Sequence, residues 1–597
     1  ASNKSVTGNI DNAISFDGSN DYIEVSNSSS LSVDGDQLTL MAWVYRTGAV
    51  ANNGGRIISK SDGGTIDDYE IAEGSWGTNC GVTTYNSGAV YAIAPGNANT
   101  PLNTWTHLAC VYDGENVYLY INGVLSDSTP ATGNIVQSGN NLSIGAHLHS
   151  PSNRRFTGNV DEVSIWSRAM SVSEITQVYN RQSATKSIFR SVGPGNTTAL
   201  ATGTGNDLTI SSGVATFASA LADNIGVGDA IQYDSDNNGS IDAVMFIHGR
   251  TDSQNYTVAL ADGSTPSDMA VADQNWSIFR AYTAASAAEN GTENTGIDIA
   301  VRDFDTWTGG RDLVTNKEQW NIALYGEAVS DGSVSIDGWV TSSNYRLKFF
   351  TPYLSSHVGV SQRHNGVFDE TKHVFERSII GTAIEVNSSF VTFDGIQLDG
   401  KVPVGAGGFA GVEFKGNELN DLSVIKNSLI RAIPGSSGTG IILSGGGTNA
   451  RTKAAFNNII YGWDYGVFLN YANANGDYLV YNNTLVNNRV GFEGYSGGSN
   501  KIIQNNLVTQ SRTQDFGTIY GSKTVLNNIS SDDSADDHGG SGNKVNQQIF
   551  FNSFETHDYR LAGHSYSAIG TGLDLSADPN YAFNTDILGN TRTRWDI

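Results

Sequence analysis

The sequence is poor in cysteine and in charged residues for its length. Its 597 residues include two cysteines, and Asp, Glu, Lys and Arg together make up 16%, against roughly 25% in an average domain. Gly (68 residues), Asn, Ser and Thr are abundant instead, which is typical of a secreted β-protein. Cys80 and Cys110 both lie in the first domain-sized segment. One disulfide in an exported protein is therefore favoured, and two buried free thiols are the alternative.

Basic residues and long apolar runs are also scarce. Lys and Arg number 34 against 60 Asp and Glu, which gives a formal charge of −26. This deficit of cations argues against a phosphate-binding groove, so we expect no nucleic-acid partner. No run of about 18 apolar residues occurs, so we expect no membrane span. The acidic balance fits a solvated surface, and it also fits ligands for Ca²⁺.

One short phrase returns along residues 427–528 and indicates a repeating fold. The asparagines at its second position are Asn427, Asn458, Asn483, Asn506 and Asn528. Their separations of 31, 25, 23 and 22 residues fit the coils of a right-handed parallel β-helix, which take roughly 20 to 30 residues each. Because asparagines at one corner of successive coils can bond to one another, we predict an asparagine ladder. An Asn-rich antiparallel sandwich is the alternative.

Residues 1–182 alternate apolar and polar positions in short runs, as in 37–44 and 117–123. This spacing predicts an antiparallel sandwich. Several motifs in the segment resemble those of the laminin-G-like, concanavalin-A-like jelly roll. They are Phe16-Asp17-Gly18 with Asp21-Tyr22, Trp105-Thr106-His107, Val111-Tyr112-Asp113-Gly114, and 158–163 with Trp166. The resemblance covers the whole segment and implies a module that binds carbohydrate or protein and closes with a short helix over 171–179.

The same resemblance implies a structural Ca²⁺ near the strand ends. Asp17, Asp21 and Asp161 are the positions that match. A hard cation needs several oxygen ligands at once, and carboxylates from distant parts of the sequence could converge in this fold. The alternative is that these aspartates cap turns by accepting hydrogen bonds from nearby backbone amides.

Aromatic residues in this segment are candidates for carbohydrate binding. Trp76, Tyr85 and Tyr91 could stack on sugar rings if they are exposed. The alternative is that they are half-buried strand residues, which is the commoner state of such side chains.

A small separate β-domain is predicted over 187–275. Within it, residues 234–242 reproduce the first nine positions of an EF-hand calcium loop. The ligand positions are Asp234, Asp236, Asn238 and Asp242. Position twelve is Met245 where a bidentate Glu is expected, and the flanking residues indicate strands and not helices. A hairpin turn that needs Asn-Gly is therefore favoured, and a Ca²⁺ site is the alternative.

Residues 276–597 are predicted to form the parallel β-helix with an N-terminal cap. Strand-like runs at 297–301 and 320–326 indicate wider first coils, and a short helix near 284–289 would cover the open end. The segment resembles right-handed β-helix proteins of the pectate-lyase-like superfamily, such as polysaccharide lyases, pectin-type hydrolases and phage tailspikes. The expected fold class is thus all-β throughout: jelly-roll sandwich, small β linker domain and parallel β-helix.

The solenoid lacks the sequence signatures of enzymes with this fold. Its lyases need a basic residue together with acids that hold Ca²⁺, and its hydrolases need two or three Asp on neighbouring coils. Lys426, Arg431, Lys453 and Lys501 are scattered, and neither the paired-Asp nor the Gly-His-Gly signature of pectin hydrolases occurs. We therefore assign no catalytic residue from the sequence.

These observations predict an extracellular or cell-surface protein that binds polysaccharide or glycoprotein glycans, in which a lectin-like module is carried on a rigid stalk. Such a rod could also self-associate into a filament or surface layer. The first alternative is a polysaccharide lyase or glycoside hydrolase with the jelly roll as targeting module. The second is a phage tailspike-like protein. The fold alone does not decide among them.

Overall fold

The computed structural model describes most of the chain. The described residues are 4–7, 9, 12–48, 54–61, 67–74, 77–86, 89–96, 98–148, 154–183, 185–269, 271–402, 408–416, 421–433, 435, 437–444, 451–470, 477–495 and 500–597. Contacts divide the chain into two compact units, Ala1–Ala184 and Thr185–Ile597. Among the helices of the described residues, none is long and apolar enough to cross a membrane.

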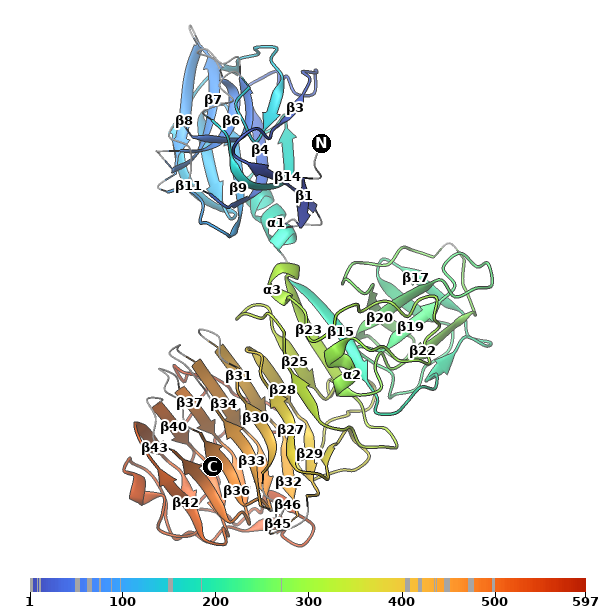
Figure 1. Cartoon of the computed structure of the whole chain (residues 1–597), viewed down its shortest axis with the longest axis vertical. Coiled ribbons are helices and arrows are strands. Elements are labelled where there is room, and N and C mark those ends of the chain that lie inside the picture. The colour runs from blue at the N-terminus through green and yellow to red at the C-terminus, as the bar shows by residue number, and fades with distance from the viewer. Residues whose placement is uncertain are drawn as a thin grey trace. The chain divides into compact units, whose positions relative to one another are not determined.

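The first unit is a sandwich of two antiparallel sheets (Figure 1). The first sandwich sheet contains, in spatial order, β1 (Ser5–Thr7), β2 (Asn12–Asp17), β14 (Thr157–Trp166), β4 (Leu38–Arg46), β9 (Trp105–Tyr112), β10 (Asn116–Ile121) and β11 (Val124–Pro130). The second sandwich sheet contains β12 (Asn134–Ile135), β7 (Gly77–Tyr85), β6 (Asp67–Gly74), β5 (Gly55–Ser61), β13 (Leu142–Ile144) and β3 (Ile23–Val25), with β8 (Ala89–Pro95) also paired to β7. Apolar side chains such as Leu40, Val44, Ile71 and Val82 fill the space between the sheets. The predicted antiparallel sandwich is confirmed.

Two further predictions for this unit are confirmed. Cys80 on β7 and Cys110 on β9 form a disulfide with their Cα atoms 5.5 Å apart, so the bridge joins the two sheets inside the core. The closing helix is α1 (Val172–Ser183). It begins with a capping box, because the Glu174 amide donates to Ser171 Oγ and the Ser171 amide donates back to the Glu174 carboxylate.

The second unit begins with a strand of the solenoid and not with the small β-domain. β15 (Lys186–Val192) pairs in parallel with β23 (Glu318–Leu324). Between these strands lies an antiparallel insert sheet. It contains β16 (Ala201–Thr202), β22 (Trp276–Phe279), β19 (Ala230–Tyr233), β20 (Ala243–Arg250), β21 (Asn255–Ala259), β18 (Val214–Phe217) and β17 (Leu208–Ser211). The strands of the insert sheet therefore lie between Ala201 and Phe279, and both ends differ from the predicted range 187–275.

Two buried arginines tie the insert to the solenoid. Arg190 on β15 donates from Nε and Nη2 to the Asp305 carboxylate at 2.7 and 2.8 Å, and its guanidinium lies 3.6 Å from the ring centre of Phe246 in the insert. Arg280, just after β22, makes two 2.8 Å bonds to Asp229 of the insert and donates to Glu327, which follows β23 of the solenoid, at 3.2 Å. Breaking a buried pair by removing one partner is costly, so these contacts fix the insert against the first coils.

Three parallel sheets form the solenoid, whose strands follow one another as rungs in Figure 1. Solenoid sheet 1 contains β15, β23, β25 (Leu347–Phe350), β28 (Val391–Asp394), β31 (Asp421–Lys426), β34 (Arg451–Phe456), β37 (Asp477–Tyr481), β40 (Asn500–Gln504) and β43 (Lys523–Leu526). Solenoid sheet 2 contains β24 (Val334–Ile336), β27 (Gly381–Val386), β30 (Phe409–Phe414), β33 (Gly438–Leu443), β36 (Tyr465–Leu469), β39 (Val490–Gly494) and β42 (Gln514–Ile519). Solenoid sheet 3 contains β26 (Phe375–Arg377), β29 (Gln397–Gly400), β32 (Leu429–Ala432), β35 (Ile459–Tyr461), β38 (Thr484–Val486), β41 (Leu507–Thr509) and β44 (Ile529–Ser530). The predicted parallel β-helix is confirmed.

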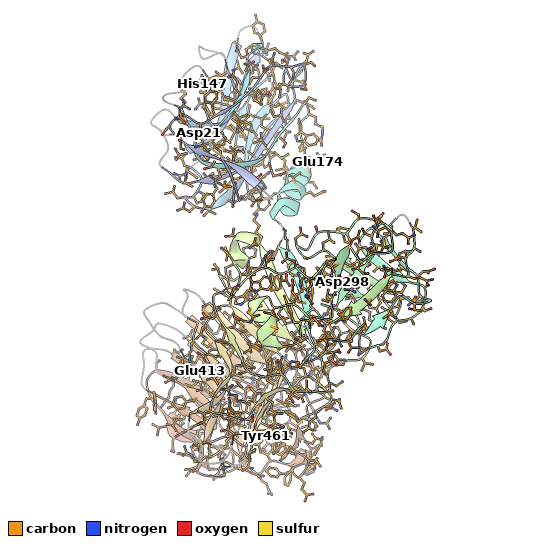
Figure 2. The ribbon with its side chains drawn as sticks, turned by 45° about the vertical axis from the view of Figure 1, so that its right-hand side comes forward. Asp21, His147, Glu174, Asp298, Glu413 and Tyr461 are labelled. Atoms are coloured by element: carbon orange, nitrogen blue, oxygen red, sulfur yellow. A yellow bond between two sulfur atoms is a disulfide. The ribbon has the colours of Figure 1, made fainter. Side chains whose placement is uncertain are left out.

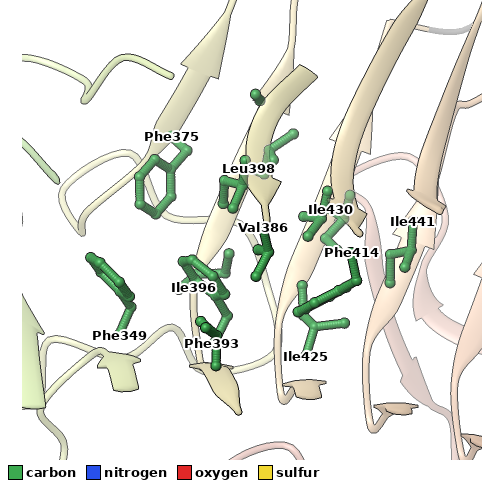
Figure 3. Packing of buried hydrophobic residues seen from close by; sticks show 14 of the residues in the cluster. Phe349, Phe375, Val386, Phe393, Ile396, Leu398, Phe414, Ile425, Ile430 and Ile441 are labelled. Carbon is green, nitrogen blue, oxygen red and sulfur yellow. The ribbon is translucent and has the colours of Figure 1, made fainter. Parts of the chain in front are cut away.

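The interior of the solenoid is apolar and stacked by coil. Figure 3 shows Phe349 and Phe393 of successive coils side by side in the core. Their rings are stacked, with centres 5.0 Å apart. Helix α2 (Ala285–Asn290) buries Ala285 and Ala288 in the same core, close to the predicted 284–289. The other helices described are α3 (Leu313–Asn316) and a 3-10 turn, Asp536–His538.

A ladder of asparagine side chains follows the corner between solenoid sheets 1 and 3. Asn458 Nδ2 donates to Asn483 Oδ1 at 2.9 Å, and Asn483 donates to Asn506 at 3.0 Å. The row continues through Asn528 at 3.0 Å to Asn543 at 3.3 Å. The side chains of the first four are buried, and each donates to a backbone carbonyl as well. Polar groups inside the corner are thereby satisfied.

The prediction that Asn427 belongs to this row is wrong by one position. Leu429 pairs with Ile459, so Ser428 is the equivalent of Asn458. Asn427 lies in a neighbouring row, the first-position asparagines, which share a φ of 52° to 56°. They are Asn427, Asn457, Asn482, Asn505 and Asn527. Asn tolerates this left-handed conformation better than most residues, and in an Asn-Asn pair the sequence alone does not show which residue adopts it.

The C-terminal segment follows the first-position asparagines. After the hairpin β45 (Phe551–Ser553) and β46 (Asp558–Leu561), the chain returns along the outside of the corner. The side-chain amides of Asn457, Asn482, Asn505 and Asn527 donate to the carbonyls of Thr585, Asp596, Leu573 and Thr571, at 2.8 to 2.9 Å. The first-position asparagines, which form the turns between strands, therefore also bind the C-terminal segment.

Candidate functional site

Polar side chains gather on the outer face of the second sandwich sheet. Along β6, Tyr69 and Ile71 point into the core, so Glu70 between them lies on the opposite face. Its neighbours across the sheet are Ser59 on β5 and Gly81 on β7. No sequence motif marks Glu70 or Ser59 as a site residue. The alternation of polar and core residues along β6 is the signal that could have found the first of them.

Glu70 is held between a cation and a phenol. Arg56 Nε lies 2.5 Å from Glu70 Oε2, and the Tyr91 hydroxyl donates to Glu70 Oε1 at 2.5 Å. Tyr91, on β8, lies across Gly81 to reach this carboxylate, and a Cβ at residue 81 would overlap its ring. The Ser59 hydroxyl nearby is buried, and no described residue hydrogen-bonds to it. Ser59, Glu70 and Arg56 are only 1% to 9% exposed, and their donors and acceptors are of the kind that bind a hydroxylated ligand.

Tyr85 lies on the same face as Tyr91. Thr83 pairs with Tyr91, and Tyr85 pairs with Ala89, so the two tyrosines are diagonal neighbours on adjacent strands, a separation of about 7 to 8 Å. The Tyr85 side chain is 63% exposed, whereas Tyr91 is half-buried. Both predicted aromatics therefore border the Glu70 cluster. Trp76, the third one predicted, lies outside the described residues.

The predicted calcium ligands of the first unit are only partly brought together. Asp17 Oδ1 accepts from the amides of Ser19 and Asn20, which lower the pKa of Asp17. Asp21 Oδ2 accepts from the Asp17 amide and binds Lys4 Nζ at 2.7 Å. Asp161 is buried on β14, and Glu162 donates its amide to it. Asp17 and Asp21 thus show the turn-capping contacts of the alternative interpretation.

A tighter group of carboxylates lies in the insert. Within the described residues, Asp234, Asp236 and Asp242 form the group of potential metal ligands whose oxygens all lie within 4.8 Å of one another. They occupy the loop of the hairpin β19–β20, whose strands pair from Tyr233 to Ala243, as the hairpin interpretation predicts. Burial raises the pKa of Asp234, but backbone amides of the loop, led by Gly239, outweigh this and the pKa lies below its usual value. Asn238 Oδ1 accepts from the Ser240 amide. The set could hold a hard cation through oxygen ligands.

Acidic groups on the outside of the solenoid are paired with arginines. Asp394 binds Arg363 at 2.8 Å, and Asp399 binds Arg431 at 2.6 Å. Further along the stack, Asp464 binds Arg489 at 2.5 Å. Burial raises the pKa of Asp394, but the charges of Arg363, Lys348 and Lys426 outweigh this and hold the pKa well below its usual value. Asp394 is therefore not the protonated acid that glycoside hydrolysis needs.

A known family matches the first unit. Residues 17–176 match the model of the concanavalin A-like lectin/glucanases superfamily, Laminin_G_3. The first unit carries a concanavalin A-like fold. The Glu70 cluster and the two tyrosines thus lie on one sheet of a concanavalin A-like sandwich. No curated protein matches the chain significantly.

Solved structures give weaker likenesses. Domain 4 of AbnA, a GH43 extracellular arabinanase from Geobacillus stearothermophilus, in complex with arabinotriose, is 20% identical over 29% of this chain and 80% of its own, with a TM-score of 0.24. The CBM40 of Ruminococcus gnavus IT-sialidase bound to α2,3 sialyllactose is 14% identical over 28% of this chain and 96% of its own, with a TM-score of 0.24. The heptameric SAP-like pentraxin from Limulus polyphemus is 18% identical over 28% and 80%, with a TM-score of 0.22. At TM-scores this low the likeness carries no argument about ligand or function.

Proposed function

We propose that the protein binds a glycan on the outer face of the second sandwich sheet. The observation that carries the proposal is the exposed ring of Tyr85 beside the Tyr91–Glu70–Arg56 cluster. Sugars present hydroxyl groups at their edges and C–H groups on their faces. A carboxylate paired with a guanidinium can bind the first, and a tyrosine ring can pack against the second. The match to a lectin and glucanase superfamily supports the same ligand class.

We propose binding and not cleavage as the role of this face. Glu70 already binds both Arg56 and Tyr91, and the solenoid carboxylates Asp394 and Asp399 are each paired with arginine. A retaining or inverting hydrolase needs one carboxyl group that stays protonated as the acid. These contacts support adhesion to a polysaccharide or glycoprotein outside the cell, with the solenoid as a rigid support whose coils hold one another.

A glycan array with the full chain tests the proposal. We expect Tyr85→Ala and Tyr91→Phe each to weaken binding of the best glycan by roughly 5- to 30-fold. Trp166→Ala removes an exposed aromatic from the other sheet and is the matched control, for which we expect unchanged binding. Equal affinity in all three variants would exclude this face. Release of reducing ends or unsaturated products from the bound glycan would instead favour the enzyme alternative.

A further inference from the structure

A cavity lined by both charged and aromatic residues lies on the outside of the solenoid, between solenoid sheet 3 and the hairpin β45–β46. It has a volume of about 290 Å³. Asp399, Arg431 and Tyr461 line it from the same position of three successive coils, since Asp399 pairs with Arg431 and Arg431 with Tyr461. His557 and Tyr559 line it from the hairpin. The size is near the lower end of ligand pockets, roughly 300 to 1,000 Å³, and suits one small ring.

The charged groups around this cavity carry no positive excess. Arg431 binds Asp399 at 2.6 Å and Glu370 at 3.2 Å. Lys401, also in the lining, binds Glu376 at 2.8 Å and lies 3.7 Å from Asp399. Two cations thus face three carboxylates, which leaves no excess positive charge for an anion. Hydrogen-bonding groups in such an arrangement suit an uncharged ligand with several hydroxyls.

Aromatic rings form another wall of the cavity. The centre of the Tyr461 ring lies 5.2 Å from that of His557 and 5.0 Å from that of Tyr559. Tyr461 and Tyr559 are buried, whereas His557 is exposed at the rim. A cavity with an aromatic wall and a carboxylate–guanidinium pair has both the surfaces that a sugar ring needs.

The hydroxyl of Tyr461 lacks a hydrogen-bond acceptor among the described residues. The side chain is 5% exposed and its hydroxyl oxygen is buried. Arg431 lies beside it but can only donate, so no described residue accepts the hydroxyl hydrogen. Burial raises the pKa of Tyr461 to about 12 against the opposing effect of Arg431, so the group remains a donor. Buried polar groups in folded proteins are nearly always satisfied. A ligand oxygen in the cavity would satisfy this one. Figure 2 labels Tyr461 on the solenoid.

We propose that this cavity binds one neutral sugar residue, with the Tyr461 hydroxyl and Arg431 donating to sugar oxygens, Asp399 accepting from sugar hydroxyls, and the His557 and Tyr559 rings packing against the sugar face. The site is independent of the one on the first unit. The protein then has two glycan-binding sites, on separate units. The lack of excess positive charge at the second distinguishes it from a site for uronate or sialic acid.

Carbethoxylation of histidine in the full chain tests the proposal locally. His557 is exposed, and a sugar in the cavity would cover it. We expect at least one of glucose, galactose, mannose, xylose, arabinose or N-acetylglucosamine to slow modification of His557 several-fold at millimolar concentration. Modification of His564, also exposed, should be unaffected. Tyr461→Phe should raise the half-protecting concentration by roughly 3- to 10-fold. Tyr481→Phe, which removes a tyrosine hydroxyl bonded to Asp578 elsewhere on the solenoid, should leave it unchanged.

Each other result overturns the assignment. If none of these sugars protects His557, the cavity is not a neutral sugar site. If only glucuronate or sialyllactose protects it, the ligand is anionic and the charge argument fails. If the half-protecting sugar concentration is the same for Tyr461→Phe as for the wild type, and the melting temperature of the variant is unchanged, the hydroxyl is not a ligand group. Because His557 reports on the solenoid alone, failure here is distinct from failure of the array experiment on Tyr85 and Tyr91.

Discussion

Tyr91 reaches across Gly81 to donate its hydroxyl hydrogen to Glu70, at 2.5 Å. The absence of a side chain at residue 81 is what lets the ring lie there. Glu70 is thereby fixed from two sides, since Arg56 binds its other oxygen. The proposed binding face therefore depends on a glycine that offers no chemistry of its own.

Gly81→Ala is predicted to reduce glycan binding without unfolding the sandwich. The new Cβ would overlap the Tyr91 ring and turn it away from Glu70, toward solvent. We expect binding to fall by roughly 5- to 30-fold and the melting temperature of the first unit to change little. Gly74→Ala is the control on the same sheet, because a Cβ there makes only ordinary contacts, the nearest at 3.5 Å. Unchanged binding by Gly81→Ala would show that the Tyr91–Glu70 contact is not used.

Asn483→Ala is predicted to destabilise the solenoid strongly. The side chain is fully buried, donates to Asn506 and to the Ala455 carbonyl, and accepts from Asn458. Its removal leaves several buried polar groups unsatisfied, so we expect a loss of about 3 kcal/mol in the free energy of unfolding. Urea titration followed by circular dichroism measures it. Asn344→Ala, at an exposed position, should cost less than about 0.5 kcal/mol. Similar costs for both would contradict a structural role for the ladder.

Reduction of the Cys80–Cys110 bridge is predicted to destabilise the first unit alone. The bridge spans a sequence separation of 30, for which loop-closure entropy gives about 3 to 4 kcal/mol. Scanning calorimetry with and without a reductant, or with the double variant Cys80→Ala and Cys110→Ala, should show a lower melting temperature for the first unit alone. The transition of the second unit, which contains no cysteine, serves as the internal control. A downward shift of both would show that the units do not unfold independently.

Loop 234–242 is predicted to bind Ca²⁺. Three carboxylates with oxygens within 4.8 Å of one another repel unless a cation lies between them. Millimolar Ca²⁺ should raise the melting temperature of the second unit, EDTA should reverse the rise, and Asp236→Ala should abolish it. Asp268→Asn, at another turn of the insert, should leave the response intact. If Ca²⁺ does not change the melting temperature of the second unit, the loop is a hairpin turn that binds no Ca²⁺.

Glu293 is predicted to make the second unit less stable as the pH rises. Burial raises the pKa of Glu293 to about 7, despite hydrogen bonds from the amides of Asp305 and Phe304. The folded state binds this proton more tightly than the unfolded state, so the stabilisation is complete below about pH 4.5 and is lost toward pH 7. Glu293→Gln can still accept both amides, and it should remove this loss, worth about 1 kcal/mol after solvent screening. Urea midpoints at pH 5 and 8 measure it.

The control for this pH effect is Glu555→Gln, an exposed glutamate in the same unit. We expect its pH profile to match that of the wild type. A Glu293→Gln profile that runs parallel to the wild type would show that Glu293 is ionised at no cost in the folded protein.

The architecture could be predicted because its signals are local and repeated. The Asn phrase marks each coil at nearly constant spacing, and strand alternation marks the sandwich. Register was harder, since Asn427 and Ser428 differ from the later Asn-Asn pairs and only strand pairing shows which residue enters the ladder. The strand β15 could not be assigned to the solenoid, because its partner β23 lies more than a hundred residues further along the chain.

The candidate sites were less predictable because they combine distant segments. Three residues of the cavity on the solenoid come from one repeated position, the third residue of successive strands of solenoid sheet 3. They are Asp399, Arg431 and Tyr461. Counting from the first-position asparagines Asn427 and Asn457 aligns Arg431 with Tyr461, whereas counting from the predicted pair Asn427 and Asn458 does not. Nothing in the sequence places His557 opposite them, since the hairpin that carries it is docked by packing against the coils.

The asparagines that hold the tail have a consequence for quality control in the cell. Their amides reach the carbonyls of Thr571, Leu573, Thr585 and Asp596 only when the corners at Asn457, Asn482, Asn505 and Asn527 have all formed. A molecule with one misfolded coil would leave part of this segment undocked, where proteases cut most readily. A C-terminal segment that remains uncut during a brief protease pulse would therefore indicate that the coils at these four asparagines had folded in that molecule.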